Sequence, residues 1–101
     1  MEKIKWLIKR KYFFCRKNYG KKHPALIVGF TKKNPKGMSL THSKDYHTAI
    51  SLKQNPNLKD KRPAFLNKVQ NVKGKFKRAK NLQLSNDDRE QVYEYIKKRN
   101  R

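Results

Sequence analysis

One apolar segment stands out in a chain that is otherwise rich in lysine: residues 24–30, with the sequence PALIVGF. It follows directly on Lys21, Lys22 and His23. A short run of aliphatic and β-branched residues bounded by polar ones is typical of a buried β-strand. The sequence therefore predicts a core strand that begins beside two lysines and a histidine.

The net charge restricts the partners that such a domain can have. The 101 residues include 28 Lys and Arg but only 7 Asp and Glu, for a formal net charge of +21. Residues 1–86 hold 23 of the bases and three of the acids. A body this basic repels itself unless an anion binds to it. Nucleic acid is the expected partner because its backbone repeats negative charge and releases counterions on binding. A membrane surface is the rival, and a lysine-rich surface that serves solubility alone is the neutral interpretation.

Length and composition indicate one small folded domain over residues 1–101. Eleven aromatic residues supply large buried areas in a chain whose hydrophobic fraction is 35%. Cys15 is the only cysteine, which rules out an intramolecular disulfide and the usual zinc patterns. No cofactor is indicated. The sequence shows neither a signal-peptide core nor a membrane-spanning stretch, so a cytoplasmic location is expected.

The local patterns predict a mainly β fold with a terminal helix (α+β). Asn34-Pro35-Lys36-Gly37 suits a type I turn and would join strand 24–30 to strand 38–42 as a hairpin. A short helix is weakly indicated in residues 2–10. Further strands are expected at 12–15, 46–52 and 63–72. Closing these short strands into a small SH3-like barrel, over about residues 11–80, would hide their edges.

The C-terminal segment carries the residues typical of helix ends, and a helix is predicted over about residues 86–99. Ser85 is the expected N-cap, with Asp88 three residues later as in a capping box. Acidic residues lie near the start of the helix and basic ones near its end, as the helix dipole favours. The acidic cluster is therefore interpreted as serving the helix and not as a carboxylate active site.

The order of these elements resembles the MazF/PemK-like toxins, which are small barrels that cut RNA. The motifs concerned are HPALIV at 23–28, LTHS at 40–43, AFLNKVQNV at 64–72 and LSNDD at 84–88. The resemblance covers roughly residues 11–98. Where that family usually carries an arginine before the proline, this sequence has His23, and the usual opening motif of the family is not visible.

The resemblance implies a PemK-like barrel and a metal-independent endoribonuclease that leaves a cyclic phosphate and a 5′-hydroxyl. His23 takes the place of the family's arginine and Thr41 that of its threonine, with Lys22 and Ser43 beside them. The implied partners are single-stranded RNA and an antitoxin, which is either an acidic protein or, as in toxins of the ToxN kind, an RNA. A homodimer is also possible, since the family often dimerises.

The residue types fit this chemistry. Histidine can act as acid or base near neutrality, and lysine and arginine can hold a phosphate. His42 is a reserve candidate, although His42 and His47 are more often surface residues. His23 and Thr41 also have plain interpretations, as a strand-edge residue and a β-branched strand residue. The expected RNA-binding residues are Tyr19, Lys21, Lys36, Lys73, Lys75, Phe76, Lys77 and Arg78, and Phe76 is equally compatible with a core position.

Three functional hypotheses follow. The first is the toxin-type endoribonuclease. The second is a non-catalytic basic nucleic-acid-binding module that uses the same barrel, which the histidine at position 23 supports. The third is a ribosome-associated basic protein, which suits the charge but fits the strand-rich, helix-capped pattern less well.

Overall fold

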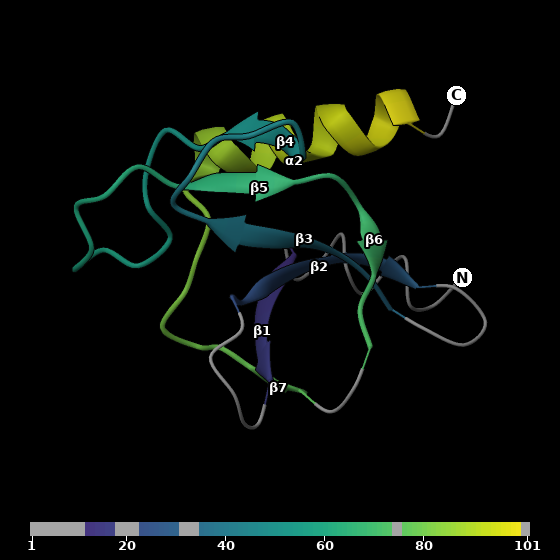
Figure 1. The fold of residues 1–101 in the computed structure, drawn as a ribbon, viewed down its shortest axis with the longest axis horizontal. Coiled ribbons are helices and arrows are strands. Elements are labelled where there is room, and N and C mark those ends of the chain that lie inside the picture. Colours follow the sequence, from purple (N-terminus) through teal and green to yellow (C-terminus); the bar gives the residue numbers. More distant parts are fainter. Residues whose placement is uncertain (1–11, 18–22, 31–34, 74–75, 100–101) are drawn as a thin grey trace.

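A computed structural model describes residues 12–17, 23–30, 35–73 and 76–99. It confirms a mainly β fold with a C-terminal helix (Figure 1). The helix expected in residues 2–10 lies outside the described residues. No helix in the described ranges has the length and apolar character needed to cross a membrane. The elements are β1 (Phe13–Lys17), β2 (Ala25–Phe30), β3 (Pro35–Thr41), β4 (Thr48–Ser51), β5 (Phe65–Asn67), β6 (Gln70–Asn71), β7 (Phe76–Arg78) and α2 (Asn86–Arg99).

The strands form one antiparallel sheet in the order β4-β5-β3-β2-β1-β7, with β6 paired to β3. β3 is central: it pairs with β2 along one edge and with β5 and β6 along the other. The pairing ends at β4 on one side and at β7 on the other, and these two strands do not pair within the described part of the chain. The sheet is therefore not closed, and a barrel is not confirmed.

The hairpin predicted between the second and third strands is confirmed, but its turn is misplaced. Pro35, Lys36 and Gly37 are not turn residues, because they already lie in β3 opposite β2. Proline is tolerated at the first position of a strand, where its missing N–H removes no essential hydrogen bond. The Pro35 carbonyl accepts a hydrogen bond from the Val72 N–H at 2.9 Å.

The single strand predicted over residues 63–72 is observed as two short strands. β5 and β6 are separated by Lys68 and Val69. The Lys68 N–H donates to the His47 carbonyl at 2.8 Å instead of continuing the ladder with β3. The break lies where the pairing moves along β3. β5 pairs with Leu40–Thr41, and β6 pairs with Lys36–Gly37.

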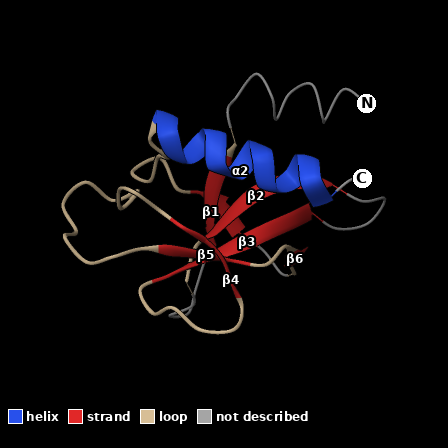
Figure 2. Ribbon diagram, turned by 90° about the horizontal axis from the view of Figure 1, so that it is seen from above, coloured by secondary structure: helices blue, strands red, loops and turns tan. Residues whose placement is uncertain are grey.

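The two faces of the sheet bury different residues, as the alternation of side chains along a strand requires. One face packs against α2, which lies across β1, β2 and β3 (Figure 2). The other face carries Cys15 and Ile27, against which Phe13, Val72 and Phe76 pack. The main core on the helix side includes Phe14, Leu26, Met38, Leu40, Leu66 and Val92.

A buried carboxylate joins α2 to the strands. Asp88 is 0% exposed, and its side chain accepts hydrogen bonds from the backbone N–H groups of Lys53 and Gln54 at 2.8 and 3.1 Å and from Gln91 Nε2 at 2.8 Å. Ser85 is the N-cap as predicted, since its Oγ accepts from the Asp88 N–H at 3.2 Å. The Asp88 side chain thus serves the segment after β4, and not only its own helix as the sequence indicated.

Replacing Asp88 by alanine tests this junction. The change leaves two backbone N–H groups without their charged acceptor, and a hydrogen bond to a charged group contributes roughly 1.5–3 kcal/mol. We expect Asp88→Ala to lower the free energy of unfolding by about 3 kcal/mol, measured by urea denaturation. Asp87→Ala, an exposed carboxylate in the same turn, is the control and should cost at most about 1 kcal/mol. An equal decrease in the free energy of unfolding for the two variants would contradict the proposed role of Asp88 in joining α2 to the strands.

Candidate functional site

Two histidines from different segments line one cleft of about 430 Å³. His23 lies just before β2, and His42 lies just after β3. In an antiparallel hairpin the start of one strand meets the end of the next, and here the Leu40 N–H donates to the Pro24 carbonyl at 2.8 Å. We call this site the histidine cleft. It is also lined by Arg16, Asn55, Asn57, Asp60 and Arg62.

The ring of His42 is held by two oxygen partners. Nδ1 lies 3.1 Å from the Pro63 carbonyl oxygen. Because a carbonyl only accepts, this contact requires the hydrogen on Nδ1. Nε2 is then the ring nitrogen at which a proton is gained or lost, and it lies 3.6 Å from Asp60 Oδ2. A proton on Nε2 would therefore face a carboxylate.

The segment between β4 and β5 forms the opposite wall of the cleft and is folded by its own side chains. The Leu52 N–H donates to the Ala64 carbonyl at 3.0 Å and closes the loop at its base. Asn55 Nδ2 donates across the loop to the Arg62 carbonyl at 3.0 Å. Asparagine and aspartate oxygens each accept from the N–H two residues later, as in Asx turns, at Asn55–Asn57, Asn57–Lys59 and Asp60–Arg62.

Asp60 and Arg62 form a two-pronged ion pair within this wall. Arg62 Nη2 lies 2.7 Å from Asp60 Oδ2, and Arg62 Nε lies 3.0 Å from Asp60 Oδ1. The hydrogen bonds from the Arg62 side chain and backbone hold the pKa of Asp60 well below its usual range, and the same carboxylate raises the pKa of Arg62. The Arg62 side chain is 66% exposed, so part of its guanidinium still faces solvent.

The sequence found only part of this site. The cleft is lined by His23, a predicted catalytic residue, and by His42, which was a reserve candidate. The sequence analysis missed Asn55, Asn57, Asp60 and Arg62, because they lie between the strands expected at 46–52 and 63–72, where no element was assigned. The available signal was the spacing of side-chain acceptors two residues before their partners, which is typical of a structured turn.

Thr41 and Ser43 lie beside the cleft and do not line it. Thr41 is half-buried and pairs with Phe65 of β5, and its Oγ1 accepts from the Ser43 N–H at 3.3 Å. Thr41 thus shapes the turn that carries His42. Lys22, the remaining catalytic candidate, lies outside the described residues.

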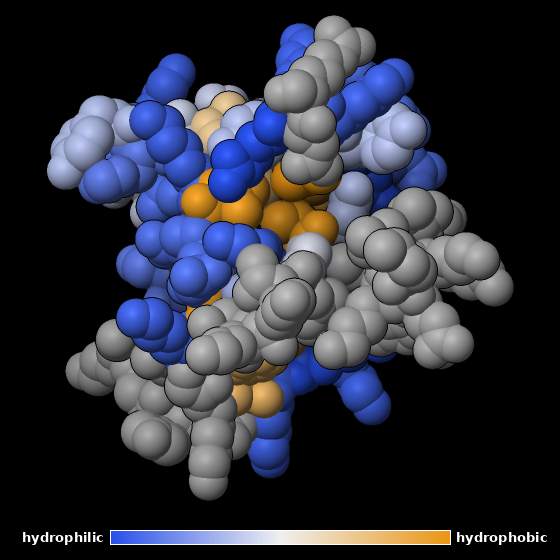
Figure 3. Space-filling view, turned by 90° about the vertical axis from the view of Figure 1, so that its right-hand side faces the viewer, coloured by the Kyte–Doolittle hydropathy of each residue, from blue (hydrophilic) through white to orange (hydrophobic). Residues whose placement is uncertain are grey.

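The candidate RNA-binding residues lie on several elements. Lys73, Lys77 and Arg78 are exposed, and the guanidinium of Arg78 lies 5.3 Å from the ring centre of Phe13. Lys36 and Phe76 are half-buried. In the face drawn in Figure 3 the described surface is mostly hydrophilic, with hydrophobic atoms visible in its middle. Tyr19, Lys21 and Lys75 lie outside the described residues.

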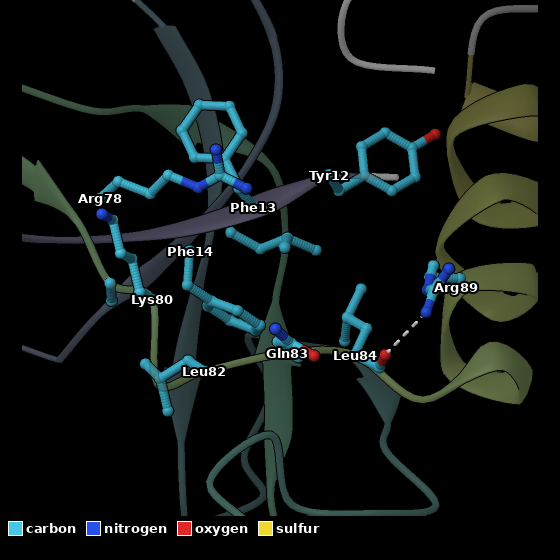
Figure 4. A pocket seen from close by; sticks show the side chains of 11 residues that line it. Tyr12, Phe13, Phe14, Arg78, Lys80, Leu82, Gln83, Leu84 and Arg89 are labelled. Atoms are coloured by element: carbon cyan, nitrogen blue, oxygen red, sulfur yellow. Dashed lines mark hydrogen bonds between the residues drawn. The ribbon is translucent and has the colours of Figure 1, made fainter. Parts of the chain in front are cut away.

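A separate hollow between β1 and α2 lacks the groups for proton transfer. It has a volume of about 500 Å³, and its lining is aromatic and aliphatic with Arg78, Lys80 and Arg89 around it (Figure 4). Arg89 Nη2 donates to the Leu84 carbonyl at 3.4 Å. Burial, with a smaller contribution from Tyr93, raises the pKa of Tyr12, so this phenol keeps its proton near neutrality. No acid and base face each other here among the described residues.

Two further groups bear on the chemistry. Burial raises the pKa of the Cys15 thiol to about 11, so the nucleophilic thiolate is scarce at neutral pH. No group of three His, Cys, Asp or Glu side chains that could hold a metal ion is found among residues 12–17, 23–30, 35–73 and 76–99. The histidine cleft, by contrast, brings two histidines and the carboxylate of Asp60 to one site.

Comparison with protein-family models, with curated proteins and with solved structures finds no match for this chain. The interpretation of the cleft depends on its geometry and charge.

The cleft wall should resist acid until well below neutrality. Because the pKa of Asp60 is lower in the folded chain than its unfolded value near 4, its stabilising effect is present above that value and is lost as the pH falls further. The difference in unfolding free energy between wild type and Asp60→Asn should not shrink from pH 8 to 5 and should shrink below about pH 4. Asp87→Asn serves as an exposed control. A difference that already shrinks between pH 7 and 5 would contradict the ion pair.

Proposed function

We propose that this protein is a metal-independent endoribonuclease of the toxin type, which cleaves single-stranded RNA in the histidine cleft. The observation that carries the proposal is that His23 and His42 line one cleft together with two arginines, Arg16 and Arg62. Two imidazoles can divide the roles of base and acid near neutral pH. Two guanidinium groups can hold the phosphate between them.

The reaction needs only these groups and the RNA itself. One imidazole takes the proton of a 2′-hydroxyl, and the 2′-oxygen forms a bond to the adjacent phosphorus. The bond from phosphorus to the 5′-oxygen breaks, and the second imidazole gives that oxygen a proton. The products are a 2′,3′-cyclic phosphate and a 5′-hydroxyl. The arginines stabilise the negative charge that develops on the phosphorane oxygens.

His42 is the better positioned of the two imidazoles. The Pro63 carbonyl holds Nδ1, so Nε2 is the proton-exchanging atom, and Asp60 lies beside it. In acid–base catalysis a third group orients the imidazole through the ring nitrogen that does not exchange the proton, and the Pro63 carbonyl has that position here. His23 is exposed at the other side of the cleft and can reach a bound strand. In this proposal His42 supplies the second proton-transfer group that a cleft with His23 alone would lack.

The toxin assignment depends on the resemblance to the MazF/PemK-like family and includes a barrel-like arrangement of the sheet. The antitoxin would be an acidic protein or an RNA, because either would neutralise the basic surface. A homodimer and a cytoplasmic location belong to the same proposal.

A non-catalytic RNA-binding module is the second candidate, and one observation favours it. Asp60 Oδ2 lies close to His42 Nε2, as in a structural ion pair that holds the loop closed. In that case the cleft would bind phosphate through Arg16 and Arg62 without proton transfer.

Substitution of the two histidines separates these candidates. The assay measures cleavage of an RNA of mixed sequence in the presence of a metal chelator. His23→Ala and His42→Ala should each lower the cleavage rate by about 10²–10⁴-fold, which is the usual contribution of a general acid or base. His47→Ala, an exposed histidine that does not line the cleft, is the matched control and should cleave normally. The products are checked for cyclic phosphate by end-group analysis. Binding without cleavage by wild type would select the module.

His23→Arg distinguishes proton transfer from charge at this position. Arginine keeps its proton in proteins, so it can hold a phosphorane but cannot act as a base. We expect His23→Arg to be as slow as His23→Ala and the wild-type rate to follow a bell-shaped pH profile. An active His23→Arg enzyme, with no histidine limb in the wild-type profile, would reduce His23 to an electrostatic role.

Affinity for RNA should depend strongly on salt. Each phosphate neutralised on a single strand contributes about −0.7 to the slope of log affinity against log salt. Lys73→Ala and Lys77→Ala should each make the slope less steep by about that amount without changing sequence preference. Lys98→Ala, in the last turn of α2, is the control. A wild-type slope near zero, measured by fluorescence anisotropy, would contradict polyanion binding.

A further inference from the structure

A second pocket lies on the face of the sheet that is opposite to α2, and it adjoins the histidine cleft. Its volume is about 580 Å³, within the range of about 300–1,000 Å³ that is usual for small-molecule sites. β3 contributes Gly37 and Ser39 to its wall, and the chain from β5 to β7 contributes most of the remainder. The wall is completed by Cys15, His23 and Ala25. His23 lines this pocket as well as the histidine cleft, so the two sites meet at the start of β2.

Three residues with side-chain amides, Asn67, Gln70 and Asn71, are among those that line this pocket. Gln70 Nε2 donates to Ser39 Oγ at 3.4 Å. An amide presents one acceptor and two donors, so it can pair with a partner that offers a donor beside an acceptor. Adenine presents that pattern at N6 and N7, and asparagine and glutamine are the side chains that read it.

One of these amides has an unused acceptor. Asn67 Oδ1 is buried and accepts no hydrogen bond from the described residues. Buried polar atoms are nearly always paired in folded proteins, so an unpaired one calls for an explanation. Because Asn67 lines the pocket, a turn of its side chain would offer this covered acceptor to a donor on a bound ligand, such as an exocyclic amino group.

The remainder of the lining suits a flat, neutral ring. Phe76 is half-buried in the pocket wall next to Cys15, and Val72 packs closely on β3, where a Cβ on Gly37 would lie 2.5 Å from Val72 Cγ2. Aromatic side chains bind bases by stacking. Among the described residues that line the pocket, Lys73 is the one lysine, whereas two arginines line the histidine cleft. The charged phosphate of a nucleotide would therefore bind in the histidine cleft, and its neutral base would bind in this pocket.

We infer that the amide pocket binds an adenine base next to the phosphate held in the histidine cleft, and that Asn67 and Gln70 select this base. The inference rests on the proposed function, since it assumes that RNA is the ligand. It goes beyond that function by assigning a base preference to named residues. His23, at the junction, sets the base and the scissile phosphate in adjoining positions.

Binding to short oligonucleotides tests the inference without requiring cleavage. The probes are 2′-O-methyl pentanucleotides, which lack the attacking hydroxyl, with four uridines and A, G, C or U at the centre. Their charges are equal, so phosphate contacts cancel in a comparison. We expect wild type to bind the A probe about tenfold or more tightly than the U probe, in line with the discrimination of a bidentate amide contact. Gln70→Ala and Asn67→Ala should reduce that ratio toward one.

The controls separate this inference from the proposed function. Gln54→Ala, an exposed glutamine outside the pocket, should keep the ratio, and so should His42→Ala, although it should no longer cleave RNA. Because the Gln70 side chain is exposed, Gln70→Ala gives a folded test even where Asn67→Ala is destabilised. Equal binding of all four probes by wild type, or an A preference that survives in Gln70→Ala, would overturn the adenine pocket. An A preference in a protein that cleaves no RNA would retain the pocket and overturn the catalytic proposal.

Discussion

The buried carboxylate of Asp88 is the interaction on which the candidate site depends. It belongs to α2, but it binds the backbone N–H groups of Lys53 and Gln54, where the chain leaves β4. Gln91 adds a hydrogen bond to the Ser51 carbonyl at 3.2 Å. From this anchored start the chain runs into the wall of the histidine cleft. The helix therefore orients the cleft without contributing a lining residue, and a carboxylate far from the cleft in sequence becomes a requirement for its shape.

Charge explains why the cleft wall needs such anchoring. The wall brings Arg62 toward Arg16 and two histidines, in a protein whose bases outnumber its acids four to one. Like charges at close range oppose one another, so an unsupported loop would move its cations apart. Asp60 offsets this locally through Arg62, and the two Asx turns with asparagine acceptors hold the backbone through neutral hydrogen bonds that do not weaken with salt. An anion bound in the cleft would relieve the remaining repulsion, which links the order of the site to its occupancy.

How far the sequence could predict this molecule depends on whether the signal was local. The C-terminal helix, its Ser85 cap and the strand at 24–30 were predictable, because periodicity and capping residues act over a few positions. His23 and His42 line one cleft because β2 pairs with β3, and the predicted hairpin was the only indication of this in the sequence. The direction of the Asp88 side chain could not be predicted, since a capping residue and a tertiary anchor look the same in sequence. The turn predicted at 34–37 is wrong for Pro35, Lys36 and Gly37, because these three residues pair with β2 as part of β3.

The position of His23 has a consequence that neither pocket shows alone. Side chains within a strand alternate between the two faces of a sheet, so a residue in β2 serves either the helix side or the opposite side. His23 lies before β2, so the alternation within the strand does not assign its side chain to one face of the sheet. It lines both the histidine cleft and the amide pocket. Under the proposed function, a strand of RNA that passes the open end of the β2–β3 hairpin would meet cations on one side and amides on the other. A single residue at that edge can then couple the recognition of a base to the positioning of the neighbouring phosphate, because both ligand groups belong to one covalent chain.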